Sequence, residues 1–565
     1  MTKPLPVGIE FYKTMIEKGY YYVDKTLMIR DILDSGAAVH LFTRPRRFGK
    51  TLALTMLKTF FEDERDADGN KIDNSFYFNG RKIMDCGEEY TKKQGQYPVV
   101  MLTLKSAKQP TWEMAYLSLA EDIADAFTRH NYVLQGDRLS EADKEKYIRL
   151  RDRKAGQIDY ARALNFLSRC LYAYHQRNVV ILIDEYDVPL ENAYFCGFYD
   201  EMLAFILSFL ASALKTNDCL ELAVVTGCLR ISRESIFTGL NNLKINSILQ
   251  NDCAEYFGFT PEETMKLLWD YGMEEKEEEV RRWYDGYRFG GRDVYNPWSV
   301  ASYASDLRSD PKALPRPYWS DTSSNSIIRE LVELADGATK REIESLLAGE
   351  TIEKPVHEDI TYEEIHESKE NLWNFLFFTG YLKKISEQRE ERTIYLKLAI
   401  PNDEIAYIYD NTILAWFHKR IEATDRIPLF QALIDCNCAK LEETLKRLLV
   451  ESISFYDEAE MFYHGFMAGM LSNLGDYWVK SNREYGDGRA DIIMEPMDED
   501  LPVIIFEFKN TRILTEMEPL AEAALKQIDE RHYDSEHREI GYKHYIKYGI
   551  CFCRKSCRVR GYREN

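Results

Sequence analysis

The chain has 565 residues, and its 73 Lys and Arg against 94 Asp and Glu give a formal net charge of −21. This length suits about three or four domains, and a hydrophobic share of 45% excludes a mainly disordered chain. The sequence has no uncharged apolar run of about 18 residues and no signal-like N-terminus, so we expect neither a membrane span nor secretion. The acidic charge disfavours a protein that coats nucleic acid with its whole surface, but it is compatible with a local basic site.

Four apolar runs in the first part of the chain are predicted to be short buried strands, and helical stretches separate them. The strands are expected at 37–42, 98–104, 178–183 and 220–225, with a helix at 52–61. Near-continuous apolar strands separated by helices indicate a parallel sheet that is covered on both faces. The sequence therefore predicts an α/β domain in residues 1–250.

The pattern changes at about residue 255. Thr260 as a cap, Pro261 at the first helical position and Glu263 three residues after the cap form a helix-start signal. We predict that residues 251–450 are mostly helical and act as a lid or linker. In residues 451–565 we expect a helix at 458–474, alternating strands, a helix at 516–531 and a last strand at 548–553.

A phosphate-binding loop is predicted between the first strand and the first helix, in the run Thr43-Arg-Pro-Arg-Arg-Phe-Gly-Lys-Thr51. Gly49 lets the backbone curl so that N–H groups and the start of the helix face a phosphate. Lys50 can reach the β and γ phosphates, and Thr51 can ligate Mg²⁺. Arg44 stands where the GxxxxGK[ST] pattern has its first glycine, so a basic surface turn before a helix is the alternative.

The second half of an ATP site is predicted after the strand at 178–183. Asp184 would hold Mg²⁺, and Glu185 would polarise the attacking water. An acidic turn after a core strand is the alternative. Thr226, at the end of the strand at 220–225, is a candidate sensor of the γ-phosphate, and Arg230 or Arg233 could stabilise transition-state charge. Surface pairing of these two arginines with carboxylates is equally compatible with the sequence.

A second constellation of charged residues lies in the last part of the chain. Asp491 is expected to open one strand, and Glu507 and Lys509 lie on the next. Residues two apart on a strand project from the same face, whereas Phe508 would point into the core. Two carboxylates and a backbone carbonyl suit Mg²⁺, and a lysine beside them can activate water and stabilise phosphate charge.

These motifs resemble a family of AAA-ATPase-like proteins that carry a C-terminal PD-(D/E)xK nuclease-superfamily domain. The matching stretches extend over nearly the whole chain: 22–26, 44–51, 183–187, 283–290, 294–298 and 378–382. The resemblance implies a P-loop ATPase domain in 1–250, a helical middle region in 251–450 and an α/β restriction-endonuclease-like domain in 451–565. RPRRFGKT is this family's form of the phosphate loop, which implies that Arg44, Arg47 and Phe48 belong to the nucleotide site. It also implies a role near the metal and DNA for Gln527 and Tyr533.

The implied cofactors are ATP and Mg²⁺, and the implied partner is nucleic acid, with DNA favoured over RNA. Its contact is expected at residues 554–563, which hold five basic residues and no acid, unless this segment is only a solvated tail. The aromatic segment 283–298 is more consistent with a packed turn than with a nucleotide contact, whereas Asp24 and Lys25 are expected near the nucleotide. A homo-oligomer is left open.

Two further interpretations stay open. The first is that ATP acts as a conformational switch in a binding protein whose C-terminal domain only holds nucleic acid. The second is an interaction protein whose degenerate nuclease fold binds another protein. The eleven scattered cysteines form no CxxC pair, which favours reduced thiols in a cytoplasmic environment.

Overall fold

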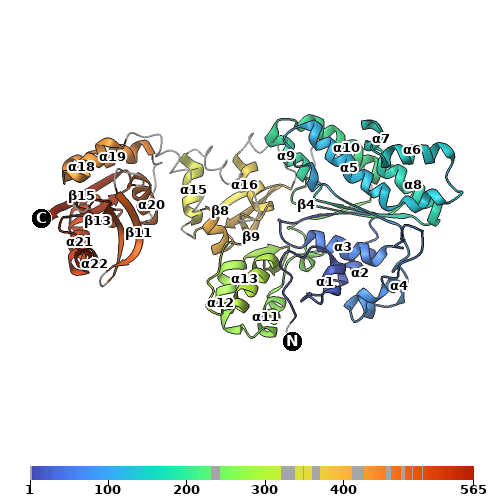
Figure 1. Ribbon diagram of the computed structural model, residues 1–565, viewed down its shortest axis with the longest axis horizontal. Helices are drawn as coiled ribbons and strands as arrows, with labels where there is room; N and C mark the ends of the chain where they lie inside the picture. Colours follow the sequence, from blue (N-terminus) through green and yellow to red (C-terminus); the bar gives the residue numbers. More distant parts are fainter. Residues whose placement is uncertain are drawn as a thin grey trace. The chain divides into compact units, whose positions relative to one another are not determined.

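The computed structural model describes residues 3–230, 242–319, 337–347, 349–358, 369–409, 426–452, 460–471, 477–485, 488–498 and 501–564 (Figure 1). The chain divides into two compact units, residues 1–323 with 353–406 and residues 324–352 with 407–565. Within the described ranges, we find no helix long and apolar enough to cross a membrane. All eleven cysteines are free thiols.

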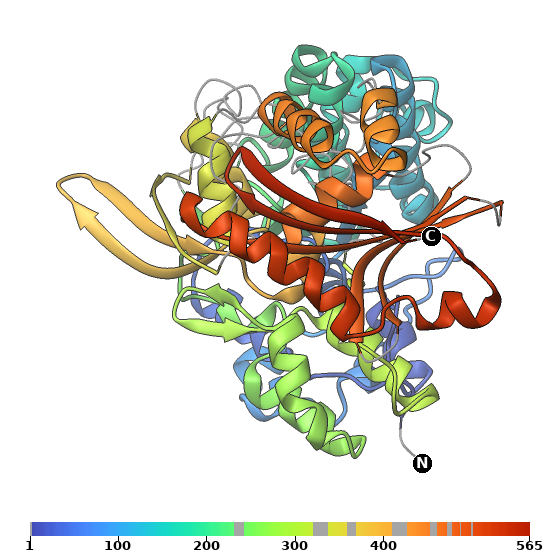
Figure 2. The ribbon, with the colours of Figure 1, turned by 90° about the vertical axis from the view of Figure 1, so that its left-hand side faces the viewer.

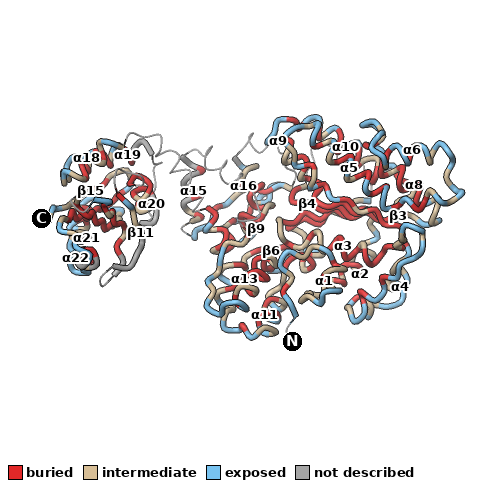
Figure 3. The backbone as a smooth tube through the Cα atoms, viewed as in Figure 1, coloured by how far each residue is buried: buried red, intermediate tan, exposed pale blue. Residues whose placement is uncertain are grey.

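A five-stranded parallel sheet lies at the centre of the first unit, with the strand order β2-β3-β4-β1-β5. The strands are β1 (Val39–Thr43), β2 (Val99–Thr103), β3 (Val179–Asp184), β4 (Leu220–Gly227) and β5 (Leu243–Asn246). β1 and β3 are buried along their whole length (Figure 3). The parallel α/β sheet expected from the apolar runs is confirmed, although the short half-polar β5 was not predicted.

Helices cover both faces of this sheet (Figure 1). One face carries α1 (Tyr12–Glu17), α2 (Leu27–Asp34) and α3 (Lys50–Phe61). The other carries α5 (Trp112–Arg129), α8 (Ala163–His175) and α10 (Tyr199–Leu214). Four further helices complete this part: α4 (Glu88–Thr91), α6 (Glu141–Arg151), α7 (Gln157–Ala161) and α9 (Val188–Cys196). This two-sided cover explains why the strands are apolar at nearly every position.

The helical middle region begins at the predicted helix start. Thr260 and Glu263 form a capping box at the head of α11 (Pro261–Asp270). There follow α12 (Glu277–Tyr284), the hairpin of β6 (Tyr287–Phe289) and β7 (Arg292–Val294), and α13 (Pro297–Ser309). Leu267, Leu268, Tyr284 and Tyr303 belong to one hydrophobic core shared by these helices.

A small sheet in residues 352–399 was not predicted. It has the order β8-β10-β9, from β8 (Ile352–Val356), β9 (Lys383–Glu390) and β10 (Thr393–Ala399). The β9–β10 hairpin projects away from its surroundings (Figure 2). β9 is mostly exposed and lacks the apolar alternation of a half-buried strand, whereas β10 buries Leu396 and Leu398. α16 (Lys369–Phe378) lies between β8 and β9 in the chain, and α15 (Gly337–Leu347) precedes β8.

A mixed sheet forms the second unit, with the order β11-β12-β13-β14-β15. Its strands are β11 (Tyr477–Tyr485), β12 (Gly488–Pro496), β13 (Val503–Asn510), β14 (Tyr545–Cys553) and β15 (Ser556–Glu564). β13 and β14 are parallel, and the other neighbours are antiparallel. The chain is therefore α/β at both ends, as the fold prediction expected.

Helices cover both faces of this second sheet (Figure 2). Phe506, Phe508 and Phe552 face a core with α18 (Ile427–Ile434), α19 (Cys438–Ser452) and α20 (Glu460–Leu471). α21 (Met517–Glu530) packs on the opposite face, followed by α22 (Ser535–Ile540). A Cβ on Gly549 of β14 would lie 2.2 Å from the carbonyl oxygen of Ala521, so α21 needs a glycine beneath it.

Candidate nucleotide and nuclease sites

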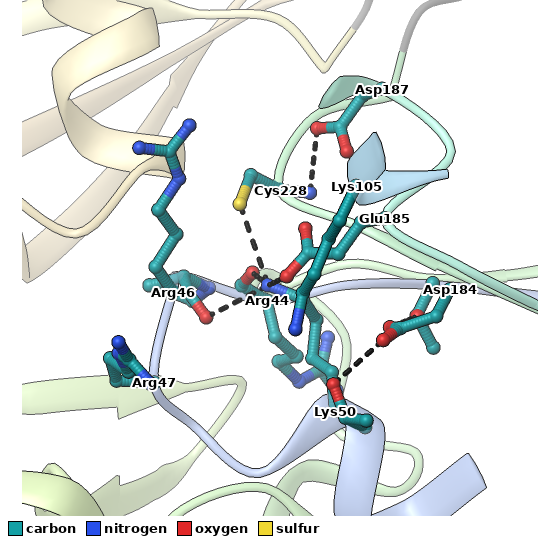
Figure 4. A network of polar contacts seen from close by, with 12 residues as sticks. Arg44, Arg46, Arg47, Lys50, Lys105, Asp184, Glu185, Asp187 and Cys228 are labelled. Atoms are coloured by element: carbon teal, nitrogen blue, oxygen red, sulfur yellow. Dashed lines mark hydrogen bonds and ion pairs between the residues drawn. The ribbon is translucent and has the colours of Figure 1, made fainter. Parts of the chain in front are cut away.

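The phosphate loop joins β1 to α3. Its backbone enters the left-handed region at Arg47 (φ 66°) and again at Gly49 (φ 82°), where glycine costs least. α3 begins at the next residue, Lys50, whose side chain is buried and donates to the carbonyl oxygens of Arg44 (3.0 Å) and Pro45 (3.2 Å) (Figure 4). The curled loop, the helix start and the buried ammonium together fit a bound phosphate chain.

Hydrogen bonds tie the ends of two strands to the loop. The Asp184 carboxylate accepts from the Thr51 hydroxyl on one oxygen and from the Thr226 hydroxyl on the other, at 2.7 Å each. These contacts follow from the sheet order, because β4 lies between β1 and β3. Burial, reinforced by the neighbouring Glu185, raises the pKa of Asp184 above its usual value. A hydroxyl beside a carboxylate is an oxygen donor set that fits Mg²⁺.

Glu185 stands directly beside Lys50. Its Oε1 lies 3.6 Å from the Lys50 ammonium, and no protein donor in the described residues meets its buried Oε2. Its backbone is left-handed, with φ 54°, a strained conformation that often occurs at functional sites. Burial disfavours the charged Lys50, but the surrounding acids offset this and hold its pKa above its usual value. One buried carboxylate oxygen of Glu185 is therefore not engaged by any described protein donor.

Tyr186 and Asp187 clamp the end of β4. Asp187 accepts from the backbone N–H groups of Cys228 (2.7 Å) and Leu229 (2.9 Å), and the Tyr186 hydroxyl donates to the Leu229 carbonyl (2.6 Å). Gly227 lies so close that a Cβ would be 2.6 Å from the Tyr186 ring. The Asp-Glu-Tyr-Asp run thus also fixes the strand end that carries Thr226.

The arginines predicted for this site occupy different places. The Arg44 guanidinium is buried between Phe257 and Phe289 and donates to the carbonyl oxygen of Asn246 (2.6 Å), so only its backbone faces Lys50. Burial lowers its pKa to about 10. Arg230 pairs with Glu358 at 3.6 Å and does not line the cavity that opens over the phosphate loop. Arg233 lies outside the described residues.

A cavity of about 450 Å³ opens over the loop. Arg47 lines it, with its guanidinium 4.3 Å from the Trp298 ring centroid, and Phe48 lines it beneath. Lys25 also lines the cavity, as expected, whereas Asp24 does not line it and accepts from the N–H and hydroxyl of Thr26 and from the N–H of Lys82. Other residues of the wall are Val7, Ile9, Lys105, Lys108 and Tyr256.

Sequence reasoning missed Trp298 and Lys105. The aromatic segment 283–298 was expected to be a packed turn, and part of it is, because Tyr287 and Phe289 pack on Phe48. Trp298, at the head of α13, instead reaches the cavity. For Lys105, the signal is its position directly after the buried strand β2, at the sheet edge where the other site residues lie.

The middle region contacts the outer side of the phosphate loop. The Trp319 indole N–H donates to the carbonyl oxygen of Arg46 at 3.3 Å. Gly380 faces Pro45 so closely that a Cβ would lie 2.9 Å from the proline ring. The predicted motif stretch 378–382 is therefore a packing partner of the loop within the first unit.

The nuclease constellation converges on β12 and β13. Asp491 accepts from the backbone N–H of Phe508 at 2.7 Å, and Lys509 lies 3.2 Å from Glu507 on the shared face. Gln527 of α21 donates to Glu507, and also contacts the Tyr533 hydroxyl at 3.2 Å. The structure thus places together the residues that the motif and the resemblance predicted. Asp491 lies inside β12 and does not open it, since the strand already begins at Gly488.

These oxygen atoms fit a divalent cation of the Mg²⁺ type, because Asp491 and Glu507 are hard carboxylate ligands on adjacent strands. Among the described residues there is no group of three or more His, Cys, Asp or Glu side chains that could hold a metal. A metal here would therefore be held by two carboxylates together with backbone oxygen or water.

The basic segment 554–563 is a strand and not a tail. It contains most of β15, which pairs with β14 along its length. Arg558 pairs with Glu442 (2.8 Å) and Glu518 (3.0 Å), and Arg560 also pairs with Glu518. Part of the positive charge expected to contact nucleic acid is therefore neutralised within the unit.

Comparison with known proteins identifies the class to which each of two domains belongs. Residues 6–237 match a family described as predicted AAA-ATPase, and residues 458–561 match the PD-(D/E)XK nuclease superfamily. The chain carries both domains, which confirms the resemblance. It is also similar to an uncharacterized protein in the vnfD 5′ region of Azotobacter chroococcum mcd 1. The two are 24% identical over 568 residues, which is 99% of this chain and 98% of that protein.

Proposed function

We propose that the protein hydrolyses ATP in its first unit and that nucleotide state controls a Mg²⁺-dependent nuclease-type site acting on nucleic acid, with DNA as the favoured substrate. The observation that carries the ATPase half is the bridge from Thr51 through Asp184 to Thr226, with Lys50 and Glu185 beside it. These groups come from the start of α3 and from the ends of β3 and β4, and their arrangement suits a nucleoside triphosphate.

The residues of the first unit have separate roles in this proposal. Lys50 binds the β and γ phosphates, and Glu185 accepts a proton from the attacking water. The water oxygen bonds to the γ phosphorus while the bond to the β–γ bridging oxygen breaks, and ADP keeps that electron pair. Thr51 and Asp184 would hold Mg²⁺, which supplies charge neutralisation. Thr226 positions Asp184 and faces the γ-phosphate.

In the second unit, Asp491 and Glu507 would hold the divalent cation, which lowers the charge on the scissile phosphate. Lys509 orients or deprotonates the attacking water, and Gln527 fixes Glu507 through its amide. The free thiols of the chain support a reducing compartment such as the cytoplasm.

The test of the ATPase half is a comparison of wild type with Lys50→Ala. We expect wild type to release phosphate from ATP with Mg²⁺, and Lys50→Ala to lose both binding and turnover. Unchanged ATP binding and turnover in Lys50→Ala would refute this half.

A second candidate function is an ATP-dependent switch whose nuclease fold only binds nucleic acid. One observation favours it: Glu507 is already engaged by Lys509 and Gln527. Incubation with plasmid and Mg²⁺ or Mn²⁺ separates the candidates, because the switch alone predicts binding without cleavage.

A further inference from the structure

Lys105 lies at the sheet edge that carries Asp184 and Glu185. β2 and β3 are parallel with Thr103 opposite Asp184, and the N–H of Leu104 donates to the Asp184 carbonyl at 3.0 Å. The chain therefore leaves β2 beside Glu185, and the Lys105 side chain extends over the phosphate loop (Figure 4). It lines the same cavity as Lys50.

Glu10 holds Lys105 on one carboxylate oxygen and Arg47 on the other. The distances are 3.6 Å to Lys105 and 3.7 Å to Arg47, both longer than a hydrogen bond. The side chains of Lys105 and Glu10 are 44% and 42% exposed. Ion pairs this exposed contribute little, so a more highly charged group, such as a triphosphate, can displace the carboxylate.

The backbone of Glu10 is fixed although its side chain is loosely held. Its carbonyl oxygen accepts from the Thr55 hydroxyl of α3 at 3.1 Å, and the same hydroxyl accepts from the N–H of Tyr12. Glu10 is thus attached to the helix that begins at the phosphate loop. Its carboxylate sits at the cavity wall between two cations from different elements.

Two other cations near the loop have partners of their own. Arg46 pairs with Glu191, and Lys25 pairs with Glu263. Arg230, the arginine that the sequence suggested for transition-state charge, pairs with Glu358 away from the cavity. Lys105 is therefore better placed than Arg230 to meet a γ-phosphate in this cavity.

We propose that Lys105 is a catalytic residue of ATP hydrolysis. When ATP binds, the Lys105 ammonium leaves Glu10 and contacts the γ-phosphate oxygens. It neutralises the charge that gathers there as the water oxygen bonds to phosphorus and the bridging bond breaks. Glu10 holds Lys105 and Arg47 while no phosphate is present. This inference rests on the proposed ATPase function.

The direct test is Lys105→Met, which removes the charge and keeps the apolar stem. Charged groups that act on the transition state are worth about 10²–10³ in rate, so we expect kcat for ATP to fall about 100-fold. Affinity for ADP should stay within about threefold, and binding of ADP with aluminium fluoride should be lost.

The matched control is Lys92→Ala, which removes one charge from a side chain that is 73% exposed, directly after α4, and does not line the cavity. It should behave as wild type. A Lys105→Met protein with kcat within about threefold of wild type would overturn the assignment.

Glu10→Gln tests the displaced carboxylate. It frees Lys105 and Arg47 to meet phosphate, so ATP should bind about three- to tenfold more tightly with kcat retained. Weaker ATP binding in this variant would contradict the role given to Glu10.

The two proposals fail in different ways. If the wild-type protein binds ATP without turnover, the proposed hydrolysis is refuted. The affinities of Lys105→Met for ATP and ADP then test whether Lys105 contacts the γ-phosphate. We expect Lys105→Met to weaken ATP binding at least about tenfold more than ADP binding. Equal losses for ATP and ADP would overturn the contact between Lys105 and the γ-phosphate.

Discussion

The two candidate sites are held together in different ways. In the nucleotide site, residues from the start of α3 and from the ends of β3 and β4 bind one another through hydrogen bonds centred on Asp184. In the nuclease site, two adjacent strands present the acids, and one helix contributes Gln527. A change in the nucleotide site therefore disturbs several elements, whereas the nuclease site depends on one pair of strands and on the packing of α21 against the sheet.

The largest expected effect separates the two sites. Glu507→Gln removes a carboxylate from the nuclease pair while keeping its size, so cleavage of plasmid should fall by about 10³ or more. ATP turnover should stay within about twofold, because the nucleotide site is built from residues of the first unit and Glu507 belongs to the second. Glu516→Gln, which changes an exposed acid before α21, is the control. Cleavage retained in Glu507→Gln would show that the acids are not catalytic.

Glu185→Gln tests the nucleotide site in the same way. It keeps the shape of the side chain but removes the proton acceptor, so kcat for ATP should fall about 10²–10³-fold. ATP should still bind, since Lys50 and the loop are unchanged. Phosphate release and equilibrium binding measure the two effects, with Glu221→Gln on the exposed side of β4 as the control. Equal losses of binding and turnover would contradict a role for Glu185 in the chemical step.

Gly549→Ala tests the narrow support of the nuclease site. The new methyl group would meet the backbone of α21 at Ala521 and Leu525, and overpacking of this kind costs about 1–3 kcal/mol. We expect a lower unfolding midpoint of the second unit and weaker cleavage, with ATP turnover unchanged. Gly156→Ala, where a Cβ meets nothing within 4 Å, should change neither. A Gly549→Ala protein with unchanged cleavage and an unchanged unfolding midpoint would contradict the claim that the nuclease site depends on the packing of α21.

The smallest expected effect is a change in pH dependence. Burial raises the pKa of Asp187 to about 6 from its ordinary value near 4. The native state therefore binds more protons than the unfolded state between about pH 4 and 6, and this group's contribution to stability falls as pH rises through that window. Asp187→Asn removes the titration.

The measurement is the unfolding midpoint at several pH values. The midpoint of Asp187→Asn relative to wild type should rise from pH 4 to pH 7. A constant difference would show that Asp187 does not titrate in this range.

The sequence predicted the parts of the sites that depend on local chemistry. Lys50, Thr51, Asp184 and Glu185 follow apolar strands in a recognisable order, and Glu507 and Lys509 share a face because a strand alternates. Thr226 also meets Asp184, because its strand lies between the other two.

Long-range packing accounts for what the sequence did not show. Arg44 belongs to the loop motif, but its side chain enters an aromatic pocket formed by residues more than two hundred positions away. The basic residues of β15 were expected to contact nucleic acid, but the fold places Glu442 and Glu518 beside them, and these acids pair with Arg558 and Arg560. In the β9–β10 hairpin, β9 has no apolar alternation to mark it, although β10 buries Leu396 and Leu398.

Coupling of the two units by nucleotide is tested most directly by plasmid cleavage with and without ATP, in wild type, Lys50→Ala and Glu507→Gln. If nucleotide state controls the nuclease site, ATP should change the cleavage rate of wild type, whereas Lys50→Ala should cleave at one rate regardless of ATP. Glu507→Gln should turn over ATP without cleaving. A wild-type cleavage rate that is the same with and without ATP would contradict the coupling.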